Sequence, residues 1–290
     1  MNHKFREKLI EKSFLIVGST AIIIVAGIFF FLFKEAWPFL KDPGFSALLK
    51  TRWVPVSFQG DSFGLLPLIT GSLLVTAVAI LIVVPLDVCS AVYISEIATG
   101  KEKEFLKPFI EILAGIPSVV IGFFGLVVLV PAVKAAFGLN TGLCAFSGSV
   151  LLALMALPTV ISISEDALAS VPSAYKQASL ALGASRMATI WKVTVPAALP
   201  GMITAIMLGT GRVIGETMAV MMVTGNSPVI TADPFESVRT MTATIAAEMG
   251  EVAFGSDHYR ALFCVGLVLL LLTFILNIAA QRILKKYKMG

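Results

Sequence analysis

Residues 165–200 read EDALASVPSAYKQASLALGASRMATIWKVTVPAALP, a polar stretch between two long apolar runs. Apolar residues recur at helical spacing on both sides of its central glycine, Gly183, and they are Tyr175, Ala178, Leu182, Ile190 and Val193. Pro172 breaks the chain before the first of these patterns, and Gly183 is a natural stop between the two. The segment therefore predicts two short helices joined at Gly183, and it is too long to be a mere connector.

Two roles for this helix pair stay open on its pattern alone. An amphipathic pair of helices can rest on the lipid surface beside the spans that it connects. It can equally be an element on which another protein docks. The spacing of the apolar residues favours neither role over the other.

Six apolar stretches surround or flank this element, at about 13–34, 68–94, 108–136, 147–168, 200–224 and 259–281. Of the 290 residues, 57% are hydrophobic and only 14% are charged, whereas about 25% are charged in an ordinary soluble domain. Each stretch approaches or exceeds the roughly 20 residues that a membrane-spanning helix needs. Pro85, Pro117 and Pro131 fall within or at the ends of spans and mark candidate kinks or broken helices. The sequence predicts an all-α, polytopic membrane protein with six transmembrane helices.

The first apolar run follows a basic start, MNHKFREKLIEK, as a secretory signal would. The run is too long for a signal core, however, and FKEAWPFL follows it in place of a small-residue cleavage site. We therefore expect it to remain as the first transmembrane helix.

Charge asymmetry predicts which way the spans run. With the N-terminus inside, the segments 95–106 and 169–199 and both chain ends face inward, and the segments 36–66 and 226–257 face outward. The inner segments then hold about twice as many Lys and Arg residues as the outer ones, which is the bias of cytoplasmic loops. We expect both termini to lie inside, and the basic pI near 9.0 follows from the same bias.

Several classes of protein are disfavoured by what the sequence lacks. Cys89, Cys144 and Cys264 are far apart and form no CxxC pair, so neither a disulfide framework nor a metal site is predicted, and no cofactor is expected. His3 and His258 lie outside the apolar runs, which excludes a histidine-based catalytic centre within the membrane. No GxxxxGK[ST] string occurs, so the chain is not expected to bind ATP in a P-loop. The basic residues are spread over four loops, and no nucleic-acid partner is predicted.

The fifth apolar stretch carries two ionisable residues, Arg212 and Glu216, and a neighbouring hydroxyl, Thr217. Arg212 is 12 residues beyond Pro200, or about 18 Å along a helix, which places it near the middle of a bilayer. In a continuous helix Glu216 would follow one turn later on the same face. Such residues mark a transport pathway or a buried structural ion pair, and we favour the pathway because charged groups are rare at that depth.

The helix pair around Gly183 resembles the EAA loop of ABC-importer permeases, the loop that plugs into a groove of the ATPase subunit. Gln177, Ala178 and Ser179 stand at the E-A-A positions, Gly183 is in register, and Val193, Val195 and Pro196 match the I-x-L-P that follows. Glutamine and serine replace the family's glutamate and second alanine. The resemblance implies that this segment couples the permease to an ATPase, through Gln177, Ala178, Gly183 and Pro196.

Two further motifs resemble phosphate permeases of the Pst system. GTGRVIGETMAVMMVTGN, residues 209–226, looks like the PstC-type subunit in its GETM form, and AGIPSVVIGFFGL, residues 114–126, resembles that subunit's third membrane region. With ISEDALASVP, the similarity runs over most of residues 65–280.

The resemblance implies a type I ABC importer permease (MetI-like) fold in a bacterial or archaeal cytoplasmic membrane. Residues 1–67 would form an N-terminal helix and an extracytoplasmic loop, and residues 68–283 the permease core with its coupling loop at 165–200. The expected partners are a homologous PstA-like permease, two PstB-like ATP-binding subunits, a PstS-like phosphate-binding protein and membrane lipid. The chain would translocate phosphate by alternating access, with Arg212, Glu216 and Thr217 on the pathway, and would do no covalent chemistry.

Three alternatives stay open from the residues themselves. The cargo could be another oxyanion, since the planar guanidinium of Arg212 suits any tetrahedral oxyanion. An ion-coupled secondary carrier could use Arg212 and Glu216 as a relay and would need no ATPase, although the long helix pair and the register of Gly183 argue against it. An intramembrane enzyme is disfavoured because no Ser/His or Ser/Lys pair is evident.

Overall fold

The computed structural model describes residues 3–57 and 60–288, and nearly all of its regular structure is helical. Within these residues, six helical segments are long and apolar enough to cross a membrane, by length and composition. They are Ile10–Leu48, Leu66–Ile97, Ser118–Phe137, Ala145–Ala169, Arg186–Gly215 and Asp257–Arg282. The predicted all-α class and the predicted six spans are confirmed.

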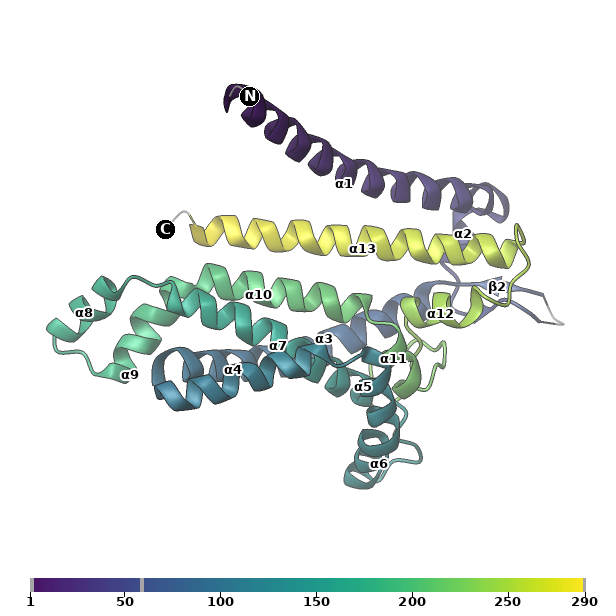
Figure 1. The fold of residues 1–290 in the computed structure, drawn as a ribbon. Coiled ribbons are helices and arrows are strands. Elements are labelled where there is room, and N and C mark those ends of the chain that lie inside the picture. The colour runs from purple at the N-terminus through teal and green to yellow at the C-terminus, as the bar shows by residue number, and fades with distance from the viewer. Residues whose placement is uncertain (1–2, 58–59, 289–290) are drawn as a thin grey trace.

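Figure 1 shows the order of the elements along the chain. They are α1 (His3–Phe39), α2 (Phe45–Leu48), β1 (Trp53–Val54), β2 (Ser62–Phe63), α3 (Leu66–Val92), α4 (Gly100–Gly115), α5 (Ser118–Phe124), α6 (Val130–Phe137), α7 (Ala145–Ala169), α8 (Ser173–Ala181), α9 (Arg186–Thr189), α10 (Val195–Gly215), α11 (Met218–Val223), α12 (Met241–Glu248) and α13 (Asp257–Lys288). Wide helical turns join several of these, at η1 (Leu40–Gly44), η2 (Tyr93–Ile97), η3 (Gly125–Leu129) and η4 (Ile190–Thr194).

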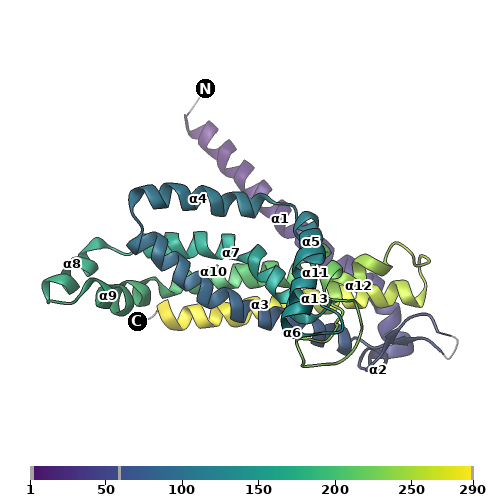
Figure 2. The same cartoon turned by 90° about the horizontal axis from the view of Figure 1, so that it is seen from below.

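Helices α3, α7 and α10 pack along their lengths and form the centre of the bundle, with α13 alongside α10 (Figures 1 and 2). Buried Val75, Leu151 and Val160 belong to one apolar cluster that these helices share. Small residues allow the close approach, because a Cβ at Gly209 would lie 2.4 Å from the Cγ2 of Val160. In membranes, where the hydrophobic effect does not drive helices together, such close packing is what holds them.

Both chain ends and the α8–α9 pair lie at one end of the bundle, whereas β1, β2 and α12 lie at the other (Figure 1). We call these the α8 end and the α12 end. At the α12 end, the carboxylate of Glu248 accepts hydrogen bonds from Trp53 Nε1 at 3.1 Å and Arg239 Nη1 at 2.6 Å, and lies 2.8 Å from His258 Nε2. We call this set of contacts the Glu248 clasp. The clasp joins β1, α12 and the start of α13.

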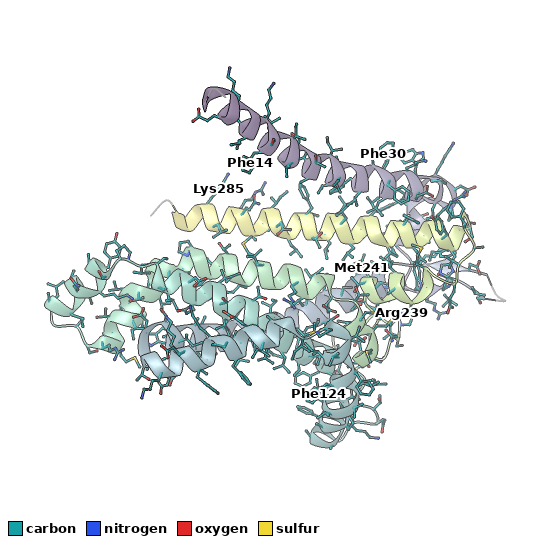
Figure 3. All side chains as sticks on the ribbon, viewed as in Figure 1. Phe14, Phe30, Phe124, Arg239, Met241 and Lys285 are labelled. Atoms are coloured by element: carbon teal, nitrogen blue, oxygen red, sulfur yellow. The ribbon has the colours of Figure 1, made fainter. Side chains whose placement is uncertain are left out.

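Helix α1 approaches α13 only over its second half, where Phe31 packs edge-on against Phe263 with ring centroids 5.6 Å apart. Toward its start α1 diverges from α13, and Phe14 is exposed there (Figure 3). Beyond the charged start of the helix, the exposed residues from Phe14 to Val25 are mostly apolar, as expected of a helix that lies in lipid or against another membrane protein.

The third span differs from the single helix predicted for 108–136. Helix α4 ends at Gly115, Ile116 is extended with φ −70° and ψ 129°, and α5, η3 and α6 turn steeply away from the bundle axis (Figures 1 and 2). Pro117 is the physical cause, since a proline disfavours the helical conformation of the residue before it. Pro117 was correctly identified as a candidate break, but the predicted start of the span at residue 108 was wrong, because residues 108–115 belong to α4 and the span begins at Ser118.

The fifth span also differs, because the predicted helix over 200–224 is interrupted. Helix α10 begins at Val195 and ends at Gly215, and Glu216 is extended with φ −71° and ψ 135°. Thr217 is also non-helical, and the short helix α11 follows it. The hydroxyl of Thr242 donates a 2.9 Å hydrogen bond to the carbonyl oxygen of Glu216, so α12 stabilises the break.

Candidate functional site

The helix pair predicted in 165–200 is present, with its turn at Gly183. Helix α8 ends at Ala181, and Gly183 has a left-handed φ of +84°. Its N–H bonds to the carbonyl of Leu180 at 2.9 Å, and the N–H of Ala184 bonds to that of Ser179 at 3.2 Å. These two bonds form a Schellman cap, which satisfies the last carbonyls of the helix and favours glycine at this position.

The end of α3 holds this pair in place through Glu96, in the turn η2. Lys176 on α8 forms an ion pair with the Oε1 of Glu96 at 2.6 Å. Arg186, at the start of α9, donates to the backbone carbonyl of Glu96. The hydroxyls of Ser179 and Thr189 join α8 to α9 at 2.9 Å. The pair is therefore a built element that is fixed to the bundle, and not a loose connection.

The outward surface of this pair is largely apolar, and it is left uncovered by the residues that the structure describes. Leu182 is 90% exposed and Tyr175 is 56% exposed, so the apolar face predicted for these two residues is open to the surroundings. Gln177 and Ala178 are also exposed, whereas Ile190 from the second pattern is buried in the bundle. The apolar face before Gly183 thus points out of the molecule, whereas Ile190, from the pattern after Gly183, packs against the bundle and anchors the helix pair.

Pro196 occupies the first turn of α10, directly after η4, and is exposed. A proline is tolerated there because the first N–H groups of a helix have no partner within it. The matched residues of the predicted coupling segment thus extend from α8 through the glycine turn to the start of α10.

Arg212 lies in the last turn of α10 and points away from the chain's core. Its Nη1 donates a 3.2 Å hydrogen bond to Thr159 Oγ1 on α7, and the side chain is otherwise exposed. Gly211 and Ile214, on the same helix, line a groove of about 230 Å³ with Thr273, which lies at the middle of α13. Arg212 is therefore close to the height of the middle of α13, and its predicted depth in a bilayer stays a prediction.

Arg212 and Glu216 are not partners on one helical face, contrary to the sequence-based expectation. The helix ends between them, and no ion pair joins them among the described residues. Glu216 lines a small cavity with Ser72 and Thr240, and this cavity of about 10 Å³ is at the limit for one water molecule. Thr217 stands at the N-cap position of α11, but its hydroxyl donates a 3.3 Å hydrogen bond back to the carbonyl of Gly215 rather than capping the helix.

Sequence reasoning missed a buried charge cluster at the end of α7. The carboxylate of Glu165 is 2% exposed and contacts Lys103 Nζ at 2.5 Å and Lys107 Nζ at 2.6 Å, both on α4. This pairing raises the pKa of Lys107. The neighbouring Ser164 donates a 2.9 Å hydrogen bond to Asp87 on α3, which is fully buried. Acidic residues at the ends of apolar spans, close to a lysine-rich segment, were the available signal.

Within residues 3–57 and 60–288, no group of three or more His, Cys, Asp and Glu side chains is arranged to hold a metal ion.

A six-span bundle with a capped helix pair fixed at one end is the architecture of a polytopic membrane protein. Over residues 98–289 the chain matches the family described as binding-protein-dependent transport system inner membrane component. A probable ABC transporter permease of Bacillus subtilis, YqgH, is 42% identical over 90% of this chain and 83% of the relative. The phosphate transport system permease protein PstC of Mesorhizobium japonicum is 32% identical over 91% of this chain and 86% of the relative.

Solved structures agree on the fold. A bacterial alginate ABC transporter in complex with an alginate-bound periplasmic protein matches with a TM-score of 0.62 at 16% identity, over 96% of this chain and 98% of that one. An inward-facing MetNI methionine ABC transporter matches with a TM-score of 0.60 at 20% identity, over 76% and 96%. The predicted MetI-like permease fold is confirmed.

The chain belongs to the family of inner membrane components of binding-protein-dependent transport systems, and its PstC relatives confirm the predicted resemblance. It is a multi-pass inner-membrane permease subunit of an ABC importer and not a catalytic subunit.

Proposed function

We propose that this chain is the PstC-type permease of an ATP-driven importer of inorganic phosphate. The observation that carries the proposal is the α8–α9 pair. Its turn is capped at Gly183, and its apolar face, with Leu182 90% exposed, is not covered by any described part of the chain. An element on which another protein docks needs an exposed apolar face of this kind. The anchorage of the helix pair to Glu96 supports this docking role over a pair of helices that only lies on the lipid surface. The phosphate assignment is supported by PstC relatives in bacteria and in an archaeon.

Support for a pathway at Arg212 comes from its exposure at mid-height. A bare guanidinium facing lipid at that depth costs about 2.5–3.5 kcal/mol on insertion scales. Its exposed side is therefore expected to face a water-filled path or a second protein. A guanidinium also matches the oxygens of phosphate with two parallel hydrogen bonds.

The pathway is proposed to run between this chain and a homologous, PstA-like permease. The described residues around Glu216 enclose only about 10 Å³, which is too small for a phosphate ion. The exposed side of α10 at Arg212, together with Thr217 beyond the end of that helix, would line the path, and Glu216 would mark the hinge between α10 and α11. Residues 1–67 are proposed as the N-terminal unit and 68–283 as the permease core.

The proposed complex contains this chain, its PstA-like partner, two PstB-like ATP-binding subunits and a PstS-like phosphate-binding protein as donor. The α8 end is proposed to face the cytoplasm, with both termini inside, and the segment 165–200 to dock on an ATPase through Gln177, Ala178, Gly183 and Pro196. ATP binding and hydrolysis occur on the partner subunits, and the movement of the coupling segment alternates the access of the pathway.

Co-purification tests the class, and competition tests the cargo. The tagged chain is expected to bring an ATPase and a second permease with it from membranes, whereas a secondary carrier would purify without an ATPase. Uptake of labelled phosphate in cells that depend on this importer should be reduced by arsenate and not by sulfate. Equal competition by sulfate would contradict the phosphate assignment.

A further inference from the structure

Glu165 occupies an unusual position for a carboxylate in a membrane protein. It lies four residues before the end of α7, and its side chain is 2% exposed. Each carboxylate oxygen contacts a different lysine, with Oε1 2.5 Å from Lys103 and Oε2 2.6 Å from Lys107. The lysines are four residues apart on α4 and so share one helical face. The arrangement is a two-pronged clamp between α7 and α4.

The clamp is the main specific tie between these two helices. None of the residues of α4 is buried, so apolar packing holds α4 only weakly to the bundle. The lysine side chains are 36% and 42% exposed and reach from solvent toward the buried acid. A buried charge of this kind is tolerated only when it is fully paired. Any displacement of the end of α7 is therefore expected to carry α4 with it.

The next contacts along the chain lead from α4 to the proposed pathway. Helix α4 continues through the break at Pro117 into α5, which packs closely against α11: a Cβ at Gly122 would lie 2.9 Å from the Cα of Ala219. Helix α11 directly follows the helix break at Glu216 and Thr217. A contiguous set of packed elements thus runs from the start of the coupling segment to this break, and packed side chains and ion pairs of this kind can carry energetic coupling between sites.

We propose that Glu165 is a positioning residue for energy coupling: through Lys103 and Lys107 it makes α4 follow the coupling segment, and α4 passes this movement through α5 and α11 to the break at Glu216. The proposal rests on the proposed function, because it requires an ATPase that moves the α8–α9 pair. It adds a second connection besides the direct one from η4 into α10.

The test uses the whole reconstituted complex with the three native cysteines replaced by alanine and a reporter, Met218→Cys, at the exposed start of α11. In the otherwise unchanged complex, ATP with vanadate should alter the rate of thiol labelling by about tenfold, a usual size for coupled sites. In Glu165→Gln the ATPase should still assemble and hydrolyse ATP, but the labelling rate should change less than about twofold. Glu104→Gln, an exposed carboxylate on α4, is the matched control and should behave as the parent.

A triple variant separates positioning from simple charge balance. Lys103→Gln with Lys107→Gln and Glu165→Gln leaves no stranded charge and should fold, yet it should remain uncoupled. Recovery of the labelling change in the triple variant would overturn the proposal and leave the cluster as structure. If Glu165→Gln does not assemble, the single Lys103→Gln and Lys107→Gln variants, which leave one partner each, should show a reduced change, and a full change in both would overturn it.

Failure of the proposed function has a different signature. In that case the parent complex lacks an associated ATPase or shows no nucleotide-dependent labelling at all. A normal response in the parent that is equal in Glu165→Gln contradicts only the role of Glu165.

Discussion

The hydrogen-bond partners of Arg212 differ from those that its sequence neighbours suggested. In sequence it appeared to pair with Glu216, but the end of α10 at Gly215 separates the two, and Thr159 is its hydrogen-bond partner. Among the described residues no carboxylate pairs with the guanidinium, which retains most of its donors for another ligand. An arginine that is exposed at mid-height of a bundle, and most of whose N–H donors have no acceptor among the described residues, is suited to bind an anionic solute.

We predict that Arg212→Gln abolishes phosphate uptake and that Arg212→Lys retains little of it. A hydrogen bond to a charged group contributes about 1.5–3 kcal/mol, so the loss of one such bond reduces uptake about tenfold or more. Amounts of assembled complex, measured by co-purified ATPase, should stay at the wild-type level. The control Thr159→Val removes only the internal partner and should reduce uptake far less.

The opposite outcome is also specific. If the neutral double variant Arg212→Gln/Glu216→Gln restores uptake that each single change had lost, the two residues act as a structural pair, contrary to the geometry. In that event Arg212 is not on the pathway.

The helix pair α8–α9 is the element whose construction explains its proposed use. A Schellman cap at Gly183 turns the chain, Glu96 fixes both helices to the end of α3, and the apolar face with Leu182 is left for a partner. The rigid anchorage matters, because a docking element that moved freely would not transmit force to α10.

We predict that Gly183→Leu separates ATP hydrolysis from uptake or detaches the ATPase. A side chain in the left-handed conformation costs about 1–2 kcal/mol, and the turn can relieve this only by changing shape. Gly138 is a matched control, because it has φ +63° at the end of α6, and a Cβ there, as at Gly183, meets no atom within 4 Å. Gly138→Leu should preserve coupling, and normal coupling in Gly183→Leu would refute the docking role.

Much of the element pattern could be predicted from the sequence because apolar runs and glycine–proline punctuation are local signals. The helix breaks in the third and fifth spans were harder to predict from the sequence. Pro117 indicated the first, but the second depends on Thr242 holding the carbonyl of Glu216 from 26 positions away. Two ion-pair sets were missed for the same reason: that of Glu165 depends on how α7 meets α4, and that of Glu96 depends on how the turn η2 meets α8.

The whole molecule has two chemically different ends. The α12 end is closed by the Glu248 clasp and the short β1–β2 pair, whereas the α8 end carries the capped helix pair with its open apolar face. This asymmetry fits a transporter that receives its cargo at one end and its energy at the other. The sidedness itself rests on the distribution of Lys and Arg.

Single cysteines test the sidedness in a background without the three native ones. Val56 and Phe254, at the α12 end, are 80% and 86% exposed, and Leu182 at the α8 end is 90% exposed. We predict that an impermeant thiol reagent labels Val56→Cys and Phe254→Cys in intact cells, and Leu182→Cys only after permeabilisation. Labelling of Leu182→Cys from outside would contradict the proposed orientation and place the α8 end on the outer side of the membrane.

The central claim is that this chain works as the permease of an ATP-driven phosphate importer, and uptake into sealed vesicles tests it most directly. The vesicles contain the complex with its two permeases and its ATPase in one orientation, the donor protein is added outside with labelled phosphate, and ATP is enclosed. The account predicts accumulation of phosphate against its gradient that requires enclosed ATP and persists when proton and sodium gradients are dissipated. Accumulation that continues without ATP and disappears with those gradients would contradict it.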